Sequence, residues 1–264
     1  MKRTWIYNAT IVNEGLKFTG SVVVEDDTIC EVLQGEVRPS VPCDAEIDAR
    51  GCYLIPGVID DHVHFRDPGL THKADMASET AAAAAGGVTS FMDMPNCNPQ
   101  TTTLEALENK FADAANKCIV NYSFYFGATN NNTELLQQLD KKHVCGVKLF
   151  MGASTGNMLV DRIESLRKIF SEAGMLIAAH CEDQTIIRWN TELVKSKYGE
   201  EDVDILFHPR IRSEEACWRS SSLAVQLAKE TGARLHILHV STARELELFE
   251  DKPISEKKIT SEAC

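Results

Sequence analysis

Two histidines separated by a single residue, His62 and His64, are the first candidates for chemistry in this sequence. They follow apolar residues 54–59, and an apolar run that ends in a polar burst is typical of a buried strand leading to a site. Because side chains alternate along a strand, both imidazoles would point to one side and could bind one metal ion. Two histidines in a polar turn are the alternative. Polar groups at the C-terminal end of an apolar strand are what a (β/α) barrel active site requires, which favours a metal site.

Polar side chains also stand at the ends of other apolar segments. The second predicted strand gives Asp93, the fourth gives Lys148, the fifth gives His180 and the sixth gives His239. Together with the first pair, four of the eight histidines fall at strand ends, and four at one end of a barrel are hard to ascribe to packing. The third and seventh predicted strands give no comparable ligand.

Lys148 lies within apolar residues 146–150, although lysine is almost never fully buried unless it is paired or chemically altered. One interpretation is a lysine that reaches the barrel mouth or pairs with a carboxylate. The other is that burial lowers its pKa, so that the neutral amine reacts with CO₂. The resulting carbamate could bridge two divalent metal ions, which would activate a hydroxide and polarise a carbonyl group. Imidazole-rich ligation with oxygen donors is compatible with zinc.

These residues can act together only in a fold that places the ends of several strands close to one another. From residue 54 onward, strand-like and helix-like segments alternate. Strands are expected at residues 54–59, 89–94, 121–128, 146–151, 176–180, 234–240 and 258–263, and helices at residues 73–85, 103–116, 133–142, 160–173 and 214–231. Alternating units of this length predict parallel strands joined by right-handed crossovers. Six or seven of them favour a (β/α)₈ TIM-like barrel over an open doubly wound sheet, and no Gly-rich dinucleotide or P-loop motif follows any strand.

Two other regions surround the predicted barrel. Residues 1–53 contain short alternating segments separated by turns, which indicates the N-terminal part of a small β-sandwich unit rather than barrel. The expected organisation is therefore a β unit at residues 1–53 and a barrel at residues 54–264. A long polar insertion, residues 183–212, is expected to contain a helix and a loop over the site.

Composition excludes several classes of protein. With 264 residues and 44% hydrophobic content, the chain fits one barrel-sized domain with a small appendage. The formal charge of −12 argues against nucleic-acid binding, and no apolar run reaches the length of a membrane span. The N-terminus lacks the pattern of a signal peptide, so the nine scattered cysteines are interpreted as reduced thiols in the cytoplasm. Cys97 and Cys181 lie beside candidate site residues and are interpreted as small buried hydrophobic side chains.

Five motifs carry a resemblance that extends over nearly the whole chain. They are PGVIDDHVHFRDPG (56–69), AAAGGVTSFMDMPNCNP (83–99), GVKLFMG (146–152), AAHCED (178–183) and LHILHVST (235–242). The sequence resembles a dihydroorotase of the amidohydrolase superfamily. The HxH motif followed by Arg66 is common to the superfamily, whereas the RDPG and MPNCNP segments narrow the resemblance to dihydroorotase-like enzymes.

The resemblance implies a role for each residue. His62 and His64 would bind the more buried of two divalent metal ions, zinc being expected. His180 and His239 would bind the second ion, and Lys148 would be the carboxylated bridge between the two. Arg66 and Asn96 would hold the substrate carboxylate, which agrees with the bidentate chemistry of arginine. The implied reaction is the reversible cyclisation of N-carbamoyl-L-aspartate to dihydroorotate in pyrimidine biosynthesis, and the implied assembly is a homodimer.

The chain departs from the family at its C-terminal end. The family carries a metal-binding, proton-shuttling aspartate on the eighth strand, and no eighth strand follows the seventh here. We therefore expect a C-terminally incomplete barrel and a fragment of a longer protein, of doubtful activity without its general acid/base. Two alternatives to dihydroorotase stay open. One is another cyclic amidohydrolase, namely a dihydropyrimidinase, hydantoinase or allantoinase. The other is a non-catalytic homologue or inactive fragment, which metal analysis would distinguish.

Overall fold

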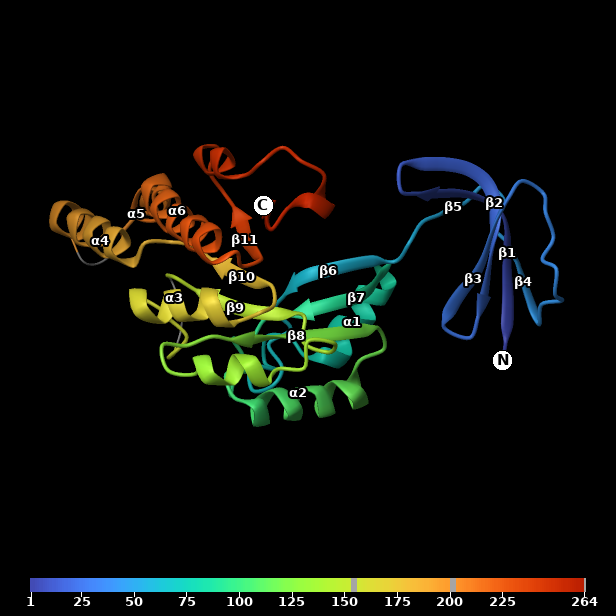
Figure 1. Ribbon diagram of the computed structural model, residues 1–264, viewed down its shortest axis with the longest axis horizontal. Coiled ribbons are helices and arrows are strands. Elements are labelled where there is room, and N and C mark those ends of the chain that lie inside the picture. The colour runs from blue at the N-terminus through green and yellow to red at the C-terminus, as the bar shows by residue number, and fades with distance from the viewer. Residues whose placement is uncertain (153–155, 200–202, 264) are drawn as a thin grey trace. The chain divides into compact units, whose positions relative to one another are not determined.

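The computed structural model describes residues 1–152, 156–199 and 203–263. By its internal contacts the chain divides into two compact units, Met1–Val58 and Ile59–Cys264, whose helices and strands are labelled in Figure 1. Among the described helices, none is long and apolar enough to cross a membrane.

The smaller unit is a five-stranded sheet with a small apolar core. The strands are β1 (Arg3–Asn13), β2 (Leu16–Glu25), β3 (Thr28–Gln34), β4 (Ala45–Asp48) and β5 (Tyr53–Leu54). Their order is β3-β2-β1-β4, with β5 also paired to β1. Ala9, Ile11 and Val22 form the buried cluster, which is consistent with the alternation of apolar residues along β1 and β2.

The strand that leads to the two histidines differs from the expected residues 54–59. Leu54 pairs with Ile11 of β1, whereas the later strand β6 runs over Val58–Val63. Pro56 lies between the two strands and has no N–H group to give to a ladder, which explains why the apolar run is divided there. His62 is therefore inside the strand, and His64 follows directly after its end.

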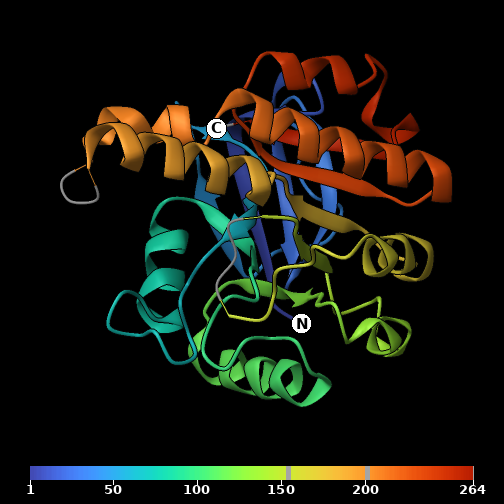
Figure 2. The same cartoon turned by 90° about the vertical axis from the view of Figure 1, so that its left-hand side faces the viewer.

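The larger unit is built on a seven-stranded sheet of an incomplete (β/α)₈ barrel, as the sequence predicts. The strands after β6 are β7 (Val88–Asp93), β8 (Asn121–Gly127), β9 (Gly146–Phe150), β10 (Ile177–His180), β11 (Leu235–Val240) and β12 (Ile259–Ala263). Their spatial order follows the chain from β6 to β12, and the pairs from β7 onward are parallel. Figure 2 shows the helices arranged around the outside of the curled sheet.

Helices connect these strands, and several of them begin at a side chain that caps the N-terminus. The α-helices are α1 (Met76–Ala85), α2 (Leu104–Lys117), α3 (Ile163–Glu172), α4 (Gln184–Tyr198), α5 (His208–Ile211) and α6 (Glu214–Thr231). The 3₁₀ helices are η1 (Thr133–Gln138), η2 (Ile205–Phe207), η3 (Arg244–Leu248) and η4 (Ile254–Glu256). Side chains of Asp75, Thr103 and Ser213 accept the first free backbone N–H groups of α1, α2 and α6.

One expected helix, residues 133–142, is only the short 3₁₀ helix η1. The chain becomes extended at Leu139, directly after η1 ends. The side chain of Asp140 accepts the backbone N–H of Lys142 and contacts the His143 ring. Such a local side-chain bond offers the backbone an alternative to helix, so the helix ends early.

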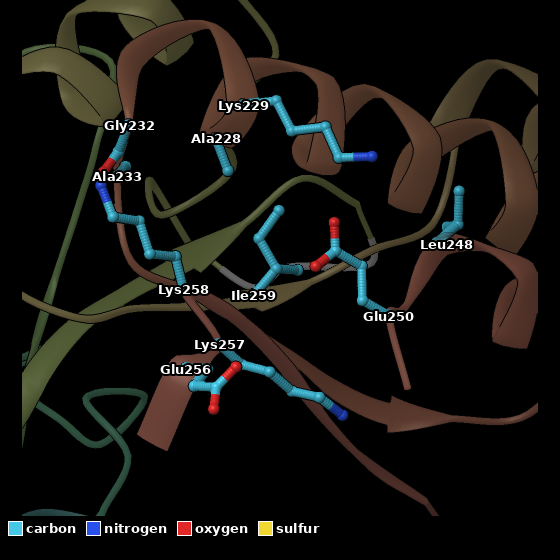
Figure 3. Close-up of a pocket in the computed structure, with 10 residues that line it drawn as sticks. All are labelled: Ala228, Lys229, Gly232, Ala233, Leu248, Glu250, Glu256, Lys257, Lys258 and Ile259. Atoms are coloured by element: carbon cyan, nitrogen blue, oxygen red, sulfur yellow. Dashed lines mark hydrogen bonds between the residues drawn. The ribbon is translucent and has the colours of Figure 1, made fainter. Parts of the chain in front are cut away.

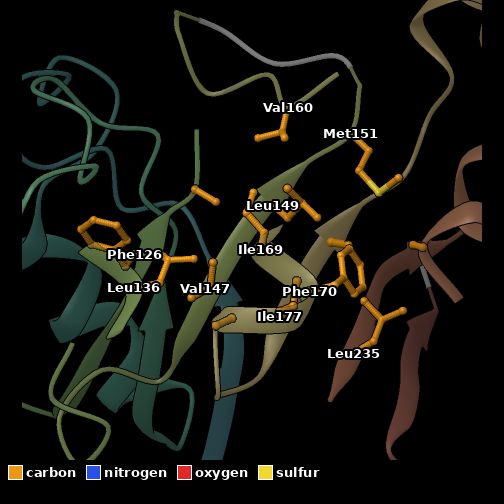
Figure 4. Packing of buried hydrophobic residues seen from close by; sticks show 14 of the residues in the cluster. Phe126, Leu136, Val147, Leu149, Met151, Val160, Ile169, Phe170, Ile177 and Leu235 are labelled. Atoms are coloured by element: carbon orange, nitrogen blue, oxygen red, sulfur yellow. The ribbon is translucent and has the colours of Figure 1, made fainter. Parts of the chain in front are cut away.

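Alternation along the strands separates the barrel interior from the helical layer. On β9, Val147 and Leu149 belong to the large core cluster, where they pack with α3 residues such as Ile169 (Figure 4). Ala178 and Leu238, on β10 and β11, belong to a second, smaller cluster. Lys148 lies between the two outward-facing residues of β9 and pairs in register with Ala178, so it faces the interior.

Candidate active site

The four histidines predicted at strand ends come together at one end of the sheet. The ring centroids of His62 and His64 are 5.3 Å apart, and those of His62 and His239 are 5.6 Å apart. The rings of His180 and His239 lie 4.7 Å apart in an edge-on arrangement. Imidazoles from β6, β10 and β11 thus form one continuous cluster, as a shared metal centre would require.

Lys148 lies in the interior beside this cluster. Its side chain is 1% exposed, and Nζ sits over the Phe150 ring at 4.4 Å from the centroid. The Phe150 ring is in turn 5.9 Å from that of His180. Within the described part of the chain, no hydrogen bond or ion pair is recorded for Nζ. Burial lowers the pKa of Lys148 to about 7, so a large share of the amine is neutral near neutral pH, as reaction with CO₂ requires.

Asn96 orients His64. Its Oδ1 lies 2.8 Å from His64 Nδ1, which is the distance of a hydrogen bond. If Nδ1 carries the proton, Nε2 of His64 keeps a lone pair for a metal ion, and the Asn96 Nδ2 group stays free to donate to a substrate. Burial is the main cause that lowers the pKa of His64 to about 4, with smaller contributions from Arg66 and His62.

A carboxylate from the seventh strand of the barrel, Glu262 on β12, was missed by the sequence analysis. Its Oε1 lies 2.5 Å from His62 Nδ1 and accepts the backbone N–H of His239. The prediction that the seventh strand gives no comparable ligand is therefore wrong. Glu262 also belongs to a group with Asp61 and His236 whose candidate ligand atoms lie within 4.8 Å of one another. The contacts to His62 and His236 hold the pKa of Glu262 far below its usual range.

His180 and His239 face each other through ring nitrogens. His180 Nδ1 lies 2.9 Å from His239 Nε2, while His180 Nε2 lies 2.7 Å from Oε2 of Glu182. Arg212 donates to the same carboxylate, with Nε 2.7 Å from Oε1. The segment after α4 thereby contributes to the site, as expected for residues 183–212, of which residues 200–202 lie outside the described residues. Burial opposes ionisation of Glu182, but the bonds to Arg212 and His180 prevail and lower its pKa to about 2.

The donor set fits divalent metal ions. Burial lowers the pKa of His239 to about 4 and also lowers that of His180, so both rings are neutral at pH 7 and present lone pairs. Carboxylates contact His62 and His180 at the nitrogen opposite the one available to a metal, which is the usual arrangement around metal-binding histidines. Neutral imidazoles held by carboxylates beside a buried amine are compatible with zinc.

Arg66 stands at the mouth of this cluster on a strained backbone. Its φ is 62°, a left-handed value that few residues other than glycine adopt, and φ of His239 is 38°. Among the described residues, no ion pair or hydrogen bond of the Arg66 guanidinium is recorded. The loop after it is held by Asp67, which is 2% exposed and accepts the Met76 N–H and the Lys117 ammonium. These bonds fix the shape of the loop that carries Arg66.

The RDPG and MPNCNP segments pack directly on one another. Asn98 donates its backbone N–H to Pro68 O at 3.0 Å. A Cβ at Gly69, whose φ is 83°, would overlap the backbone of Asn98, so only glycine permits the approach. The RDPG and MPNCNP segments therefore form one structural unit, which carries Arg66 and Asn96.

A hollow elsewhere in the barrel unit contrasts with this site. It lies beside the end of α6 and the start of β12, and its lining includes Lys229, Glu256 and Ile259 (Figure 3). None of the ten residues drawn there is a histidine or a cysteine. It adjoins the N-terminal ends of the strands, where barrels place residues for stability rather than chemistry.

Comparisons with known proteins agree with this geometry. The sequence profile of the family described as "Dihydro-orotase-like" matches residues 51–245. A dihydroorotase of Methanosarcina mazei is 35% identical over 204 residues, which cover 75% of this chain and 43% of that protein. An allantoinase of Deinococcus radiodurans is 32% identical over 233 residues, which cover 85% of this chain and 51% of that protein.

Solved structures give the same picture of the fold. An L-hydantoinase (dihydropyrimidinase) from Arthrobacter aurescens superimposes with a TM-score of 0.88 at 27% identity, covering 100% of this chain and 58% of that one. The chain spans about half the length of the curated relatives it matches. The profile match, the relatives and the strand-end histidine cluster lead to one conclusion: the chain belongs to the dihydroorotase-like family of the amidohydrolase superfamily.

Proposed function

We propose that this protein is a dihydroorotase, which interconverts N-carbamoyl-L-aspartate and dihydroorotate in pyrimidine biosynthesis. Its relatives are named dihydroorotases, allantoinases and hydantoinases, so they support cyclic amide hydrolysis in general. The observation that carries the finer proposal is Arg66. This cation lies close enough to His64 to lower the pKa of that ring, and no carboxylate of the described chain pairs with it.

Substrate recognition would depend on Arg66 and Asn96. Dihydroorotate and N-carbamoyl-L-aspartate both carry a carboxylate beside the reacting amide, whereas allantoin, hydantoin and dihydrouracil have none there. A guanidinium binds a carboxylate through two parallel hydrogen bonds, and the free amide group of Asn96 adds a third donor. Arg66 is only partly buried, so its guanidinium is accessible to an anionic ligand, which supports the carboxylate substrates.

The metal roles belong to the same proposal. His62 and His64 would hold one divalent ion, His180 and His239 a second, and a carbamate on Lys148 would bridge them. When bound, such ions supply a nucleophile at neutral pH and polarise the amide carbonyl. The protein's own groups would fix the tautomers of the imidazoles, keep a large share of Lys148 neutral by burial and hold the substrate carboxylate.

The proposal also covers the cellular location and the assembly of the protein. All eight cysteines of the described chain are free thiols, which supports the proposed reducing, cytoplasmic environment. A homodimer is proposed from the resemblance alone. Light scattering on the purified protein would test it, and a monomeric mass at micromolar concentration would contradict it.

The decisive experiment compares substrates after reconstitution with zinc. We expect turnover of N-carbamoyl-L-aspartate and dihydroorotate to exceed that of dihydrouracil, hydantoin and allantoin. Arg66→Met should lower kcat/KM for the carboxylate substrates about 10- to 100-fold, the cost of one charge-assisted recognition contact. Arg50→Met is the matched control, because Arg50 is exposed and pairs only with nearby Asp48. Preference of the wild-type protein for allantoin or dihydrouracil would overturn the proposal.

A further inference from the structure

An ion pair lies in the core directly behind the two substrate-binding loops. Asp93 ends β7, and Lys110 lies on α2. Lys110 Nζ is 2.6 Å from Asp93 Oδ2, and both residues are 1% exposed. The Lys110 ammonium also sits 4.7 Å from the centroid of the Phe124 ring.

Each member of the pair holds the backbone of one loop. Asp93 Oδ1 accepts the N–H of Phe65 at 2.9 Å, and Phe65 lies between His64 and Arg66. Lys110 Nζ donates to Met94 O at 3.1 Å, two residues before Asn96. The pair therefore connects the chain on both sides of the His64 and Asn96 contact.

Stabilisation of the fold does not by itself explain why Asp93 and Lys110 are paired in the core. Replacing a buried ion pair by well-packed apolar residues is often neutral or stabilising, because two charges must lose their water. Burial favours the protonated form of Asp93 and raises its pKa, while Lys110 opposes that change. What apolar residues could not replace is the pair of hydrogen bonds to the Phe65 N–H and the Met94 carbonyl.

We propose that Asp93 and Lys110 are positioning residues that set the distance between the loop of His64 and Arg66 and the loop of Asn96. This inference rests on the proposed function for its consequence in catalysis, but its structural content can be measured separately. The pair touches no candidate metal ligand through a side chain. Its effect on the substrate passes through the backbone at Phe65 and Met94.

The test uses the double variant Asp93→Leu/Lys110→Met, which removes both charges and both hydrogen bonds to the loop backbones and leaves no unpaired ion in the core. We expect KM for N-carbamoyl-L-aspartate to rise about 10- to 100-fold, the usual range for losing a residue that orients a ligand, with a smaller change in kcat. Leu107→Ala is the matched control. Leu107 is buried on the same helix, so its truncation lowers thermal stability without touching the pair. An equal rise of KM in both variants would mean that general loosening of α2 is responsible, and would overturn the proposal.

Two measurements decide the matter even if the protein does not act on carboxylate substrates. Nitrogen NMR of the histidines should show loss of the His64 Nδ1 bond to Asn96 in the double variant and its retention in Leu107→Ala. In the wild-type protein, hydrogen exchange should place the Phe65 amide among the slowest of the loop, because a buried carboxylate accepts it. An unchanged His64 signal in the double variant, or rapid exchange at Phe65 in the wild-type protein, would contradict the proposal.

Discussion

Asn96 Oδ1 and His64 Nδ1 lie 2.8 Å apart, so the residue proposed to bind the substrate also holds a proposed metal ligand. Recognition and metal binding are therefore linked through one hydrogen bond. A change that removes the acceptor oxygen of Asn96 should alter both, whereas a change that keeps this oxygen should affect substrate recognition alone.

The first prediction concerns Asn96→Asp. The added carboxylate would still accept from His64, but it would repel the substrate carboxylate and remove the Nδ2 donor. We expect kcat/KM for N-carbamoyl-L-aspartate to fall about 100-fold while zinc content stays the same, because metal-site support is kept. Steady-state kinetics with elemental analysis checks this. Retained activity would show that Asn96 does not contact the substrate carboxylate.

The second prediction concerns metal removal. Chelation should lower the free energy of unfolding, since an ion that binds only the folded state at 100 times its Kd stabilises by about 2.7 kcal/mol. His239→Ala should abolish the zinc-dependent rise in Tm. His143→Ala is the control, because His143 is exposed and contacts Asp140 away from the cluster. Equal behaviour of the two variants would contradict the assignment of the cluster to metal.

The third prediction concerns the amine of Lys148. Its burial keeps the amine partly neutral, so labelled bicarbonate should give a carbamate signal in ¹³C NMR of the zinc-loaded protein. Lys148→Ala should lose that signal and most activity, and small carboxylic acids should restore part of the activity. Lys141→Ala serves as control, since Lys141 donates to Gly174 O on the surface. A carbamate signal that persists in Lys148→Ala would place it on another lysine.

The fourth prediction concerns thiol reactivity and pH. Burial raises the pKa of Cys145 and of Cys181 to about 12, against 9.0 for a free thiol, so their thiolate fraction at pH 8 is about a thousandfold smaller. Iodoacetamide at pH 8 should modify exposed Cys30 and Cys52 and spare partly buried Cys145 and buried Cys181, as peptide mass spectrometry will show. These raised values also mean that stability falls as pH rises above about 9, because only the unfolded chain then releases the protons. Rapid labelling of Cys181 in folded protein would contradict its burial.

Most of the candidate site could be predicted from the sequence because its residue types are unusual at the ends of apolar strands. Histidines at the ends of apolar strands are rare without a function, and a lysine inside an apolar strand needs an explanation. Strand periodicity then placed Lys148 in the interior, and the structure agrees. The metal roles of these residues stay predictions until an ion is measured.

What the sequence did not reveal depends on contacts between distant segments. Glu262 stands in a short polar stretch that resembles a surface strand, and its proximity to His62 arises only when β6 and β12 approach across the curled sheet. The signal that could have identified Glu262 was the presence of a carboxylate within a predicted strand of the barrel. The division of residues 54–59 between two sheets was missed because an apolar sequence does not show which strand it pairs with. Pro56, which cannot donate to a strand ladder, was the one sign of a break.

The left-handed backbone of Arg66 and His239 has a consequence for engineering. A non-glycine residue in that region costs roughly 1–3 kcal/mol, and glycine would relieve the cost at either position. Glycine at either position would also remove a side chain that the proposed site needs. An effort to stabilise this fold should therefore leave Arg66 and His239 unchanged and substitute residues elsewhere.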